Sequence, residues 1–209
     1  MVAYLGRNAS VFLILTLLNG CAGDIQRKEK DRALALGVGH FREKVVVKDD
    51  SLEQVATFDT SNGFVKKRPF LSGEMKEEYL RGFLDKKTRK QNYQVYVVML
   101  HQSVDWYRPT HANFGSPLQT TKTKRTYSKK SCKDSRYTGK CFYHEEVVFP
   151  VSGAELRRVQ KAYAAQGASA IWPFRLKTKS GKDYTASIPS AEVAALLETM
   201  DAHKPVPVR

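Results

Sequence analysis

Apolar and polar residues alternate along most of the middle of the chain, with the period of two that is typical of half-buried strands. One predicted strand, between residues 93 and 101, is apolar on both faces. One face of it carries Tyr93, Val95, Val97 and Met99, and the other carries Tyr96, Val98 and Leu100. Because both faces are apolar, we expect this strand to be central in a sheet and to be covered on both sides.

Strand pairs are predicted from this alternation and from the turn-forming residues between the strands. The pairs are Glu43–Lys48 with Glu53–Asp59, Tyr79–Lys86 with Tyr93–His101, Thr120–Ser128 with Cys141–Phe149, and Ile171–Lys177 with Tyr184–Ile188. In the last pair Trp172, Phe174 and Leu176 share a face and are core candidates. The segment 74–86 also fits a helical pattern, and we favour the strand. The stretch 106–114 is expected to be a loop.

Two helices are predicted in the last third of the chain. The first covers Ser152–Gln166, where Ser152 is the N-cap, Glu155 is its capping-box partner and Gly167 is the stop. The second opens at Pro189-Ser190, and its apolar stripe should pack on the sheet. That stripe consists of Val193, Leu196, Leu197 and Met200. The predicted fold class is therefore α+β, with a β-rich antiparallel sheet or sandwich and two helices in the C-terminal third.

The first two dozen residues follow a different pattern, that of an export signal. Arg7 precedes an apolar run from Val11 to Leu18, and small or turn-forming residues come next. The run is shorter than the roughly 20 apolar residues that a membrane-spanning helix needs, which favours a cleaved signal. Two alternatives stay open: cleavage after Gly23 to give a soluble exported protein, or a buried amino-terminal helix in a cytosolic one.

The residues Leu18-Asn19-Gly20-Cys21 resemble the lipobox of bacterial lipoprotein signal peptides. This resemblance implies that the Cys21 thiol receives a diacylglycerol, that residues 1–20 are removed, and that the new amino terminus is acylated as well, for example with palmitate. Attachment by two or more acyl chains is stable, because each buried methylene contributes about 0.8 kcal/mol. Ala22, which follows the cysteine, implies an outer-membrane location facing the periplasm, by similarity to enterobacterial lipoproteins.

Removal of residues 1–20 would leave 189 of the 209 residues, enough for one ordinary domain. We expect residues 21–40 to form the lipidated cysteine, a charged spacer and a short helix near Lys28–Leu36, and residues 41–203 to form a single β-rich globular domain. Residues 204–209, with two prolines, are expected to be an extended, flexible tail. Beyond the lipobox, this arrangement looks like uncharacterised exported lipoproteins of Gram-negative bacteria, a resemblance that implies no named activity.

Cys132 and Cys141 are the two remaining cysteines, and the loop between them contains turn-forming residues. In an oxidising compartment we expect them to form a disulfide that staples the third hairpin. A bridge over a loop of this size stabilises a fold by roughly 2–3 kcal/mol in the chain-entropy model. Zinc binding is the weaker alternative, because no second cysteine pair or suitably spaced histidine accompanies them, and no metal or cofactor is expected.

The net charge is +14, from 35 Lys and Arg against 21 Asp and Glu, and its excess is concentrated between residues 120 and 140, where Asp134 is the only acidic residue. The candidate anion-binding residues there are Lys122, Lys124, Arg125, Lys129, Lys130, Lys133, Arg136 and Lys140. Such a surface attracts polyanions, so anionic lipid headgroups, lipopolysaccharide phosphates and acidic envelope proteins are candidate partners, whereas nucleic acid is not favoured outside the cytoplasm. The alternative is that these lysines keep an edge strand solvated.

One segment has part of the pattern of a zinc protease. His144 and Glu145 match the start of that motif, but Val148 stands where the second histidine would be required. In a strand, His144 and Glu146 would share one face instead. We therefore interpret them as an exposed set of ion-pair partners and not as a catalytic dyad.

A second set, His101, Ser103 and Asp105, has the residue types of a hydrolytic triad. Along a strand these side chains would be about 6–7 Å apart, too far for a hydrogen-bonded relay. The sequence therefore predicts no enzyme, but a membrane-anchored envelope lipoprotein whose β-rich domain binds or scaffolds another envelope component through the basic hairpin 120–148. A polyanion-binding protein, for lipopolysaccharide or cell wall, is the alternative, and an envelope hydrolase comes third.

Overall fold

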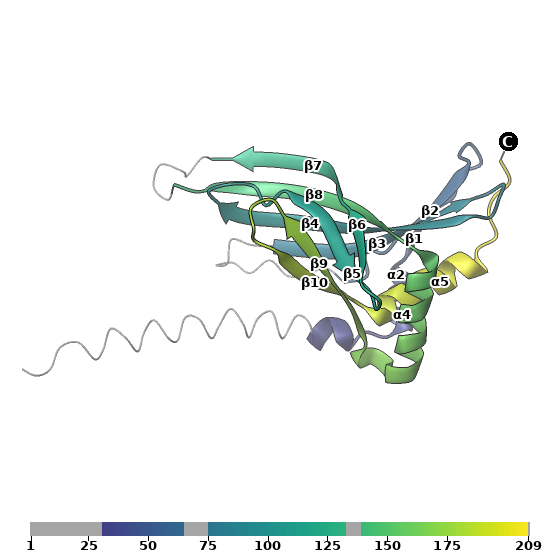
Figure 1. The fold of residues 1–209 in the computed structure, drawn as a ribbon. Helices are drawn as coiled ribbons and strands as arrows, with labels where there is room; N and C mark the ends of the chain where they lie inside the picture. Colours follow the sequence, from purple (N-terminus) through teal and green to yellow (C-terminus); the bar gives the residue numbers. More distant parts are fainter. Residues whose placement is uncertain (1–30, 65–74, 133–138, 209) are drawn as a thin grey trace, which may run out of the picture.

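The computed structural model describes residues 31–64, 75–132 and 139–208, whose strands form two antiparallel sheets (Figure 1). The larger sheet has the order β1 (Val46–Lys48), β2 (Val55–Asp59), β3 (Met75–Asp85), β4 (Gln91–Ser103), β8 (Cys141–Val151) and β7 (Lys124–Ser131). The smaller has the order β10 (Tyr184–Pro189), β9 (Ile171–Thr178), β5 (Pro109–Phe114) and β6 (Gln119–Lys122). This architecture confirms the predicted α+β class with a β-rich antiparallel core.

The smaller sheet lies across one face of the larger one, and the main core fills the space between them (Figure 1). The ring centroid of Phe149 on β8 lies 5.7 Å from that of Phe114 on β5 and 5.3 Å from that of Phe174 on β9. The helices gather at one end of the sheets: α2 (Val38–Lys44), α4 (Gly153–Gln166) and α5 (Ser190–Ala202), with the 3-10 turn η1 (Gly167–Ser169) after α4. Burial of aromatic rings from both sheets makes this core a sandwich.

β4 is central in the larger sheet, as predicted, with β3 and β8 as its neighbours. Its inward face is buried from Tyr93 to Met99. The expectation that both faces are covered is wrong for the described residues, because Tyr96, Val98 and Leu100 on the other face stay partly exposed. The Tyr96 ring stacks on that of Tyr79 at 5.2 Å and its hydroxyl donates to a glutamine, so this face suits an amphipathic side chain facing water.

Two predictions near the start of the fold have different outcomes: the strand favoured within 74–86 is confirmed, and the strand Glu43–Lys48 is wrong in its bounds. β3 is a strand, so the helical interpretation of 74–86 is wrong. The predicted strand Glu43–Lys48 is shorter than expected, because α2 extends to Lys44 and only Val46–Lys48 pairs with β2. The reason is packing. Phe41 on α2 is fully buried against Ala191 and Ala195 of α5, and this burial stabilises the helix at that position.

The region that was predicted as a loop, 106–114, contains β5, and this error is linked to a second one. The predicted strand Thr120–Ser128 is broken at Thr123, so that β6 joins the smaller sheet and β7 joins the larger. The backbone N–H of Thr123 donates to the Thr110 carbonyl at 3.0 Å, and its hydroxyl donates to the Pro109 carbonyl at 2.9 Å. The first half of the predicted strand therefore pairs with β5 in the smaller sheet, and the second half pairs with β8 in the larger sheet.

Both C-terminal helices form where the sequence predicts, but only the Ser152 half of the predicted capping box is found among the described residues, because the Glu155 carboxylate accepts from Trp172 Nε1 and from Arg158. The Ser152 side chain accepts a hydrogen bond from the Glu155 backbone N–H at 3.2 Å, and α4 ends at Gly167 with a φ of +68°. The apolar stripe of α5 is fully buried on the sheet. Its Met200 lies over Gly82 of β3, where an added Cβ would approach the sulfur to 2.1 Å, so a larger residue there would require the Met200 side chain to move.

The two ends of the chain are described unequally. Residues 31–34 are helical and belong to the short helix predicted near Lys28–Leu36, whose first part lies outside the described residues. Cys21 and the whole lipobox also lie outside them, as do Lys133 and Arg136. Residues 204–208 have no regular secondary structure, and they run back beside the β1–β2 hairpin (Figure 1). Within the described ranges, no helix combines the length and the apolar character needed to cross a bilayer.

Candidate functional site

β7 forms one edge of the larger sheet, and all eight of its residues are exposed. It carries Lys124, Arg125, Lys129 and Lys130 and no acidic residue. Lys130 places its ammonium 5.5 Å from the centroid of the Tyr143 ring. Among the described parts of the chain, no ion pair or hydrogen bond is found for the side chains of Lys124, Arg125 or Lys129. The strand therefore presents a row of unneutralised cations to solvent.

The register with β8 divides these cations between the two faces of the sheet. Lys124 lies opposite Val148 and Lys129 opposite His144, two positions on the same face of β8, of which His144 is partly exposed and Val148 is buried. Arg125 lies opposite Val147, which is buried in the core. Because side chains that lie opposite each other share a face, Arg125 is directed toward the smaller sheet. The bulge between Arg125 and Tyr127 shifts the register, so that Lys124 and Lys129 share one face although they are five residues apart.

The cysteines at the end of this hairpin lie as predicted. The Sγ atoms of Cys132 and Cys141 are 2.10 Å apart, which is disulfide distance. Of the other predicted anion-binding residues in the hairpin, Lys140 is exposed next to Cys141, whereas Lys133 and Arg136 fall outside the described residues. Only the part of the predicted basic hairpin from Lys124 onward pairs as a hairpin, β7 with β8, and the cysteine pair joins its ends; Lys122 belongs to β6 of the smaller sheet.

A basic pocket of about 320 Å³ lies where the first residues of β7 meet the smaller sheet. Its cationic lining residues are Arg108, Lys122, Arg125 and Lys179. The remaining lining residues are Pro109, Thr110, His111, Thr123, Glu145 and Val147. Two of the four cations, Lys122 and Arg125, were predicted from the sequence as anion-binding residues. Arg108 and Lys179 were not, because they lie outside the charge cluster and only the fold brings them to it.

The change of sheet at Thr123 builds this basic pocket. Lys122 is the last residue of β6, where it pairs with His111 of β5, and Arg125 lies just inside β7. On the other side, the backbone N–H of Lys179 donates to the Arg108 carbonyl at 3.1 Å. Cations from the ends of several strands are therefore held in one place by backbone hydrogen bonds, and not by flexible loops.

Glu145, at the floor of the basic pocket, is fully buried and its oxygens are satisfied from within the fold. Oε1 accepts from the Tyr107 backbone N–H at 2.7 Å and lies 3.2 Å from His101 Nε2, while Oε2 accepts from the Arg108 backbone N–H at 3.1 Å. Burial would raise the pKa of Glu145, but the hydrogen bonds from His101 and from the two backbone amides together lower it. Glu145 is thus an anchor that fixes the backbone of Arg108, whose φ is +53°.

His101 lies behind Glu145 and has no exposed surface. Its ring stacks on Tyr107 with centroids 3.7 Å apart and an interplanar angle of 4°. Its partner is Glu145, whereas Asp105 is exposed and pairs with Arg108 at 3.6 Å. The residues His101, Ser103 and Asp105 therefore do not form a relay. The sequence analysis did not predict the His101–Glu145 pair, because it links two strands that are far apart along the chain.

His144 and Glu146 share the outer face of β8, as the strand interpretation predicts. His144 Nε2 lies 3.0 Å from Glu146 Oε1, and the two side chains are 30% and 32% exposed. The Tyr127 ring packs edge-on against the His144 ring at 4.7 Å. Glu145 between them points to the opposite face, so the three consecutive residues do not converge as a zinc-protease site would require. No cluster of three metal-ligating side chains is found among the residues that the structure describes.

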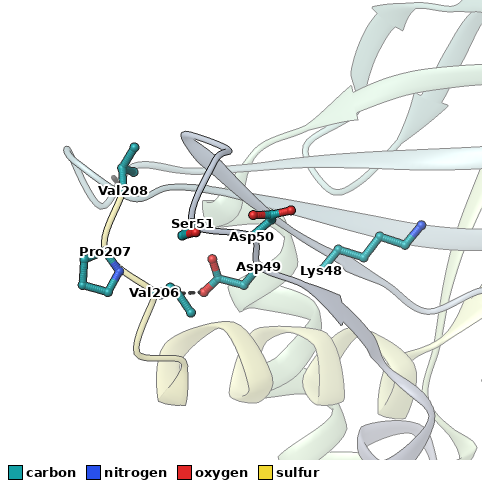
Figure 2. Close-up of a pocket in the computed structure, with 7 residues that line it drawn as sticks. All are labelled: Lys48, Asp49, Asp50, Ser51, Val206, Pro207 and Val208. Atoms are coloured by element: carbon teal, nitrogen blue, oxygen red, sulfur yellow. Dashed lines mark hydrogen bonds between the residues drawn. The ribbon is translucent and has the colours of Figure 1, made fainter.

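A second hollow, of about 660 Å³, lies between the β1–β2 turn and the C-terminal tail (Figure 2). Its buried acid, Asp49, is directed at the tail, where its Oδ2 accepts from the Val206 backbone N–H at 2.8 Å. Asp49 also pairs with Lys86 at 2.5 Å and His203 at 2.7 Å. Burial opposes ionisation, but the hydrogen bonds from Lys86, Val206 and His203 outweigh it and lower the pKa of Asp49 to about 2. Asp49 therefore serves to hold the tail and offers no free charge to a ligand.

Comparison with protein-family models, with curated proteins and with solved structures finds no match for this chain.

Proposed function

We propose that this protein is a non-catalytic lipoprotein of the bacterial cell envelope, anchored through acylated Cys21, whose β-rich domain binds a polyanionic envelope component. The observation that carries the proposal is β7, an edge strand with all residues exposed and with four cations and no acid. Such an arrangement attracts anionic surfaces and raises their local concentration. Lipopolysaccharide, whose phosphates are accessible within the envelope, is the partner that fits the proposed outer-membrane location.

The alternative explanation for these lysines is protection of an open sheet edge. Lysines on an edge strand discourage pairing with other strands, and a few are enough for that purpose. The continuation of the positive charge from β7 into the basic pocket favours binding over protection. Cations such as Lys179 are not on an edge strand of the larger sheet, so edge protection does not account for them.

The oxidised state of the cysteine pair is part of the same proposal. A disulfide between Cys132 and Cys141 closes the tip of the hairpin and limits the freedom of the chain that carries the cations. Restricting that freedom before binding reduces the conformational entropy lost on binding. Export to an oxidising compartment would keep the bridge formed.

The surroundings of His101 and His144, the histidines of the two candidate catalytic patterns, support the non-catalytic part of the proposal. His101 is buried behind Glu145 without contact with solvent, and His144 lies on the outer face of β8. A general base needs access to the proton that it abstracts. Neither position gives such access to a substrate in the basic pocket.

The test is retention of the full-length protein, purified in detergent, on resin-coupled lipopolysaccharide at about 0.15 M salt, where weak long-range attraction is largely screened. The test variant changes Lys124, Lys129 and Lys130 to Gln. The matched control changes Lys44, Lys48 and Lys161 to Gln, which removes the same charge from exposed positions elsewhere. We expect the test variant to lose retention and the control to keep it. Equal retention of both variants would contradict the proposal.

A further inference from the structure

The basic pocket differs from β7 in shape, and this difference suggests a second mode of binding. β7 is an exposed sheet edge that can meet any extended polyanion. The basic pocket is concave, and its volume of about 320 Å³ is within the range of sites for small molecules. We propose that it is a discrete site for a phosphate monoester with a small sugar-sized group. This deepens the proposed function and rests on it.

The charge of the pocket matches a dianion. Its lining has four full positive charges, from Arg108, Lys122, Arg125 and Lys179, and one carboxylate, Glu145. Every oxygen of Glu145 already accepts hydrogen bonds from within the fold and the residue has no exposed surface, so its carboxylate leaves the lining with a net positive charge. Arginine and lysine are the side chains that bind phosphate oxygens most strongly, through charge-assisted hydrogen bonds.

The cations are available for such a ligand. No ion pair or hydrogen bond is found for the side chains of Lys122, Arg125 and Lys179 within the described part of the chain. Among the described residues, the one side-chain partner found for Arg108 is Asp105 at 3.6 Å, and both of these side chains are at least half exposed. A solvated pair of this kind contributes little, so an incoming phosphate can replace Asp105 at small cost.

The backbone that carries the cations is fixed before binding. Arg108 is held on one side by its N–H bond to Glu145 and on the other by the bond from Lys179 to its carbonyl. Thr123, between Lys122 and Arg125, is held by two hydrogen bonds to the start of β5. Little backbone freedom is therefore lost on binding, which favours affinity for a small ligand.

The uncharged lining explains why the proposed ligand is an ester and not phosphate alone. Pro109 and Val147 supply apolar surface, and Thr110 and His111 supply polar atoms. The Thr110 hydroxyl lies 3.1 Å from His111 Nδ1, so both groups are oriented. A sugar has apolar C–H faces and hydroxyl groups, and it would use both kinds of surface.

The test is calorimetric titration of the full-length protein in detergent with glucose 1-phosphate, with glucose and glucuronate as comparison ligands. The site variant is Lys122→Gln with Lys179→Gln, two exposed positions whose change should leave the fold intact, as circular dichroism would verify. The control variant is the β7 triple change of Lys124, Lys129 and Lys130 to Gln. We expect the site variant to weaken binding roughly tenfold or more, and the control to change it by less than about threefold.

Each outcome has a definite meaning. Absence of binding to the wild type at millimolar ligand, or equal weakening by both variants, would overturn the discrete site. Equal binding of glucuronate would overturn the assignment to phosphate. If lipopolysaccharide retention depends on β7 while glucose 1-phosphate does not bind, the proposed function stands and this inference alone fails.

The source of the phosphate is distinguished by a second arm with vesicles of phosphatidylglycerol in phosphatidylcholine. That lipid carries a phosphodiester with one negative charge, whereas the pocket matches a monoester. We therefore expect vesicle binding, where it occurs, to depend on β7 and not on Lys122 with Lys179. Vesicle binding that is lost in the site variant would overturn the preference for a monoester and identify a lipid headgroup as the ligand.

Discussion

Two carboxylates in this protein, Glu145 and Asp49, both anchor backbone segments through hydrogen bonds, but their surroundings differ. Each accepts hydrogen bonds from backbone amides and from a histidine, and each has a pKa below its ordinary value. At Asp49 the ammonium of Lys86 and the imidazole of His203 pair directly with the acid. At Glu145 the nearby arginines and lysines do not pair with the acid, whose hydrogen bonds come from His101 and from backbone N–H groups.

This difference shows that a hydrogen-bonded carboxylate can either pair with the cations around it or leave them unpaired and able to bind a ligand. The Asp49 cluster neutralises itself and fastens the C-terminal tail to the β1–β2 turn, so it is complete without a ligand. The Glu145 cluster satisfies the acid from the interior, and the cations around the basic pocket keep their charge for something else. A buried acid therefore identifies a structural site or a binding site only when the partners of the surrounding cations are known.

The comparison predicts its largest effect at Glu145. In Glu145→Gln, one end of the amide would place N–H groups against backbone donors, and the charge-assisted hydrogen bonds would be lost. We expect a loss of about 3 kcal/mol in the free energy of unfolding, measured with urea. Glu146→Gln, next to it but on the outer face, should cost less than about 0.5 kcal/mol. Equal effects of the two changes would show that Glu145 is not an internal anchor.

The second prediction concerns the cations. Lys86→Met should cost about 2 kcal/mol in the free energy of unfolding, because it leaves Asp49 without a cation in a largely buried position. Lys122→Met at the basic pocket should change stability by less than about 0.5 kcal/mol, because Lys122 is exposed and has no partner within the described residues. A large loss in Lys122→Met would mean that the cations of the pocket are structural.

A smaller effect is expected from pH. The folded-state pKa of Asp49 is about 2, below its ordinary value of 3.8, so its contribution to stability is present above about pH 4 and is lost as pH falls toward 2. With allowance for solvent near this surface, we expect about 1 kcal/mol. The measurement is the difference in unfolding free energy between wild type and Asp49→Asn, which should shrink over this range. A difference that does not vary with pH would contradict the depressed pKa.

The smallest effect is expected at the tail. Val206→Pro removes the backbone donor to Asp49 and leaves Lys86 and His203 in place, so it should cost roughly 0.5–1 kcal/mol. Val208→Pro, two residues further along, removes a backbone N–H for which no partner is found within the described residues, and should have no measurable effect. Thermal unfolding of both variants distinguishes them. If Val206→Pro behaves like Val208→Pro, the tail does not contribute to the stability of the Asp49 cluster.

Much of the fold could be predicted from local patterns. The N-cap at Ser152, the buried stripe of α5 and the alternation in β4 each depend on neighbouring residues alone, and each agrees with the structure. The errors fall where tertiary contacts decide. Phe41 is drawn into a helix by α5, and the segment around Thr123 is divided because β5, which was not predicted as a strand, pairs with its first half.

The candidate site shows the same limit. Lys122 and Arg125 could be found from a local excess of charge, but Arg108 and Lys179 could not, since each is a single cation in an ordinary segment. The sequence placed Glu145 only in part of a zinc-protease pattern, which the structure does not form. Its role depends on the register of β8 with β4, which brings it beside His101, and sequence spacing does not reveal that register.

The central claim is that this domain works in the envelope, held by a lipid on Cys21 and carrying an oxidised basic hairpin. The most direct test is the intact mass of the protein extracted from membranes, for wild type and Cys21→Ala, with thiols alkylated before and after reduction. We predict a lipid-sized increment that is lost in the variant, absence of residues 1–20, and alkylation of Cys132 and Cys141 only after reduction. A mass that retains residues 1–20, with both thiols free, would contradict the account.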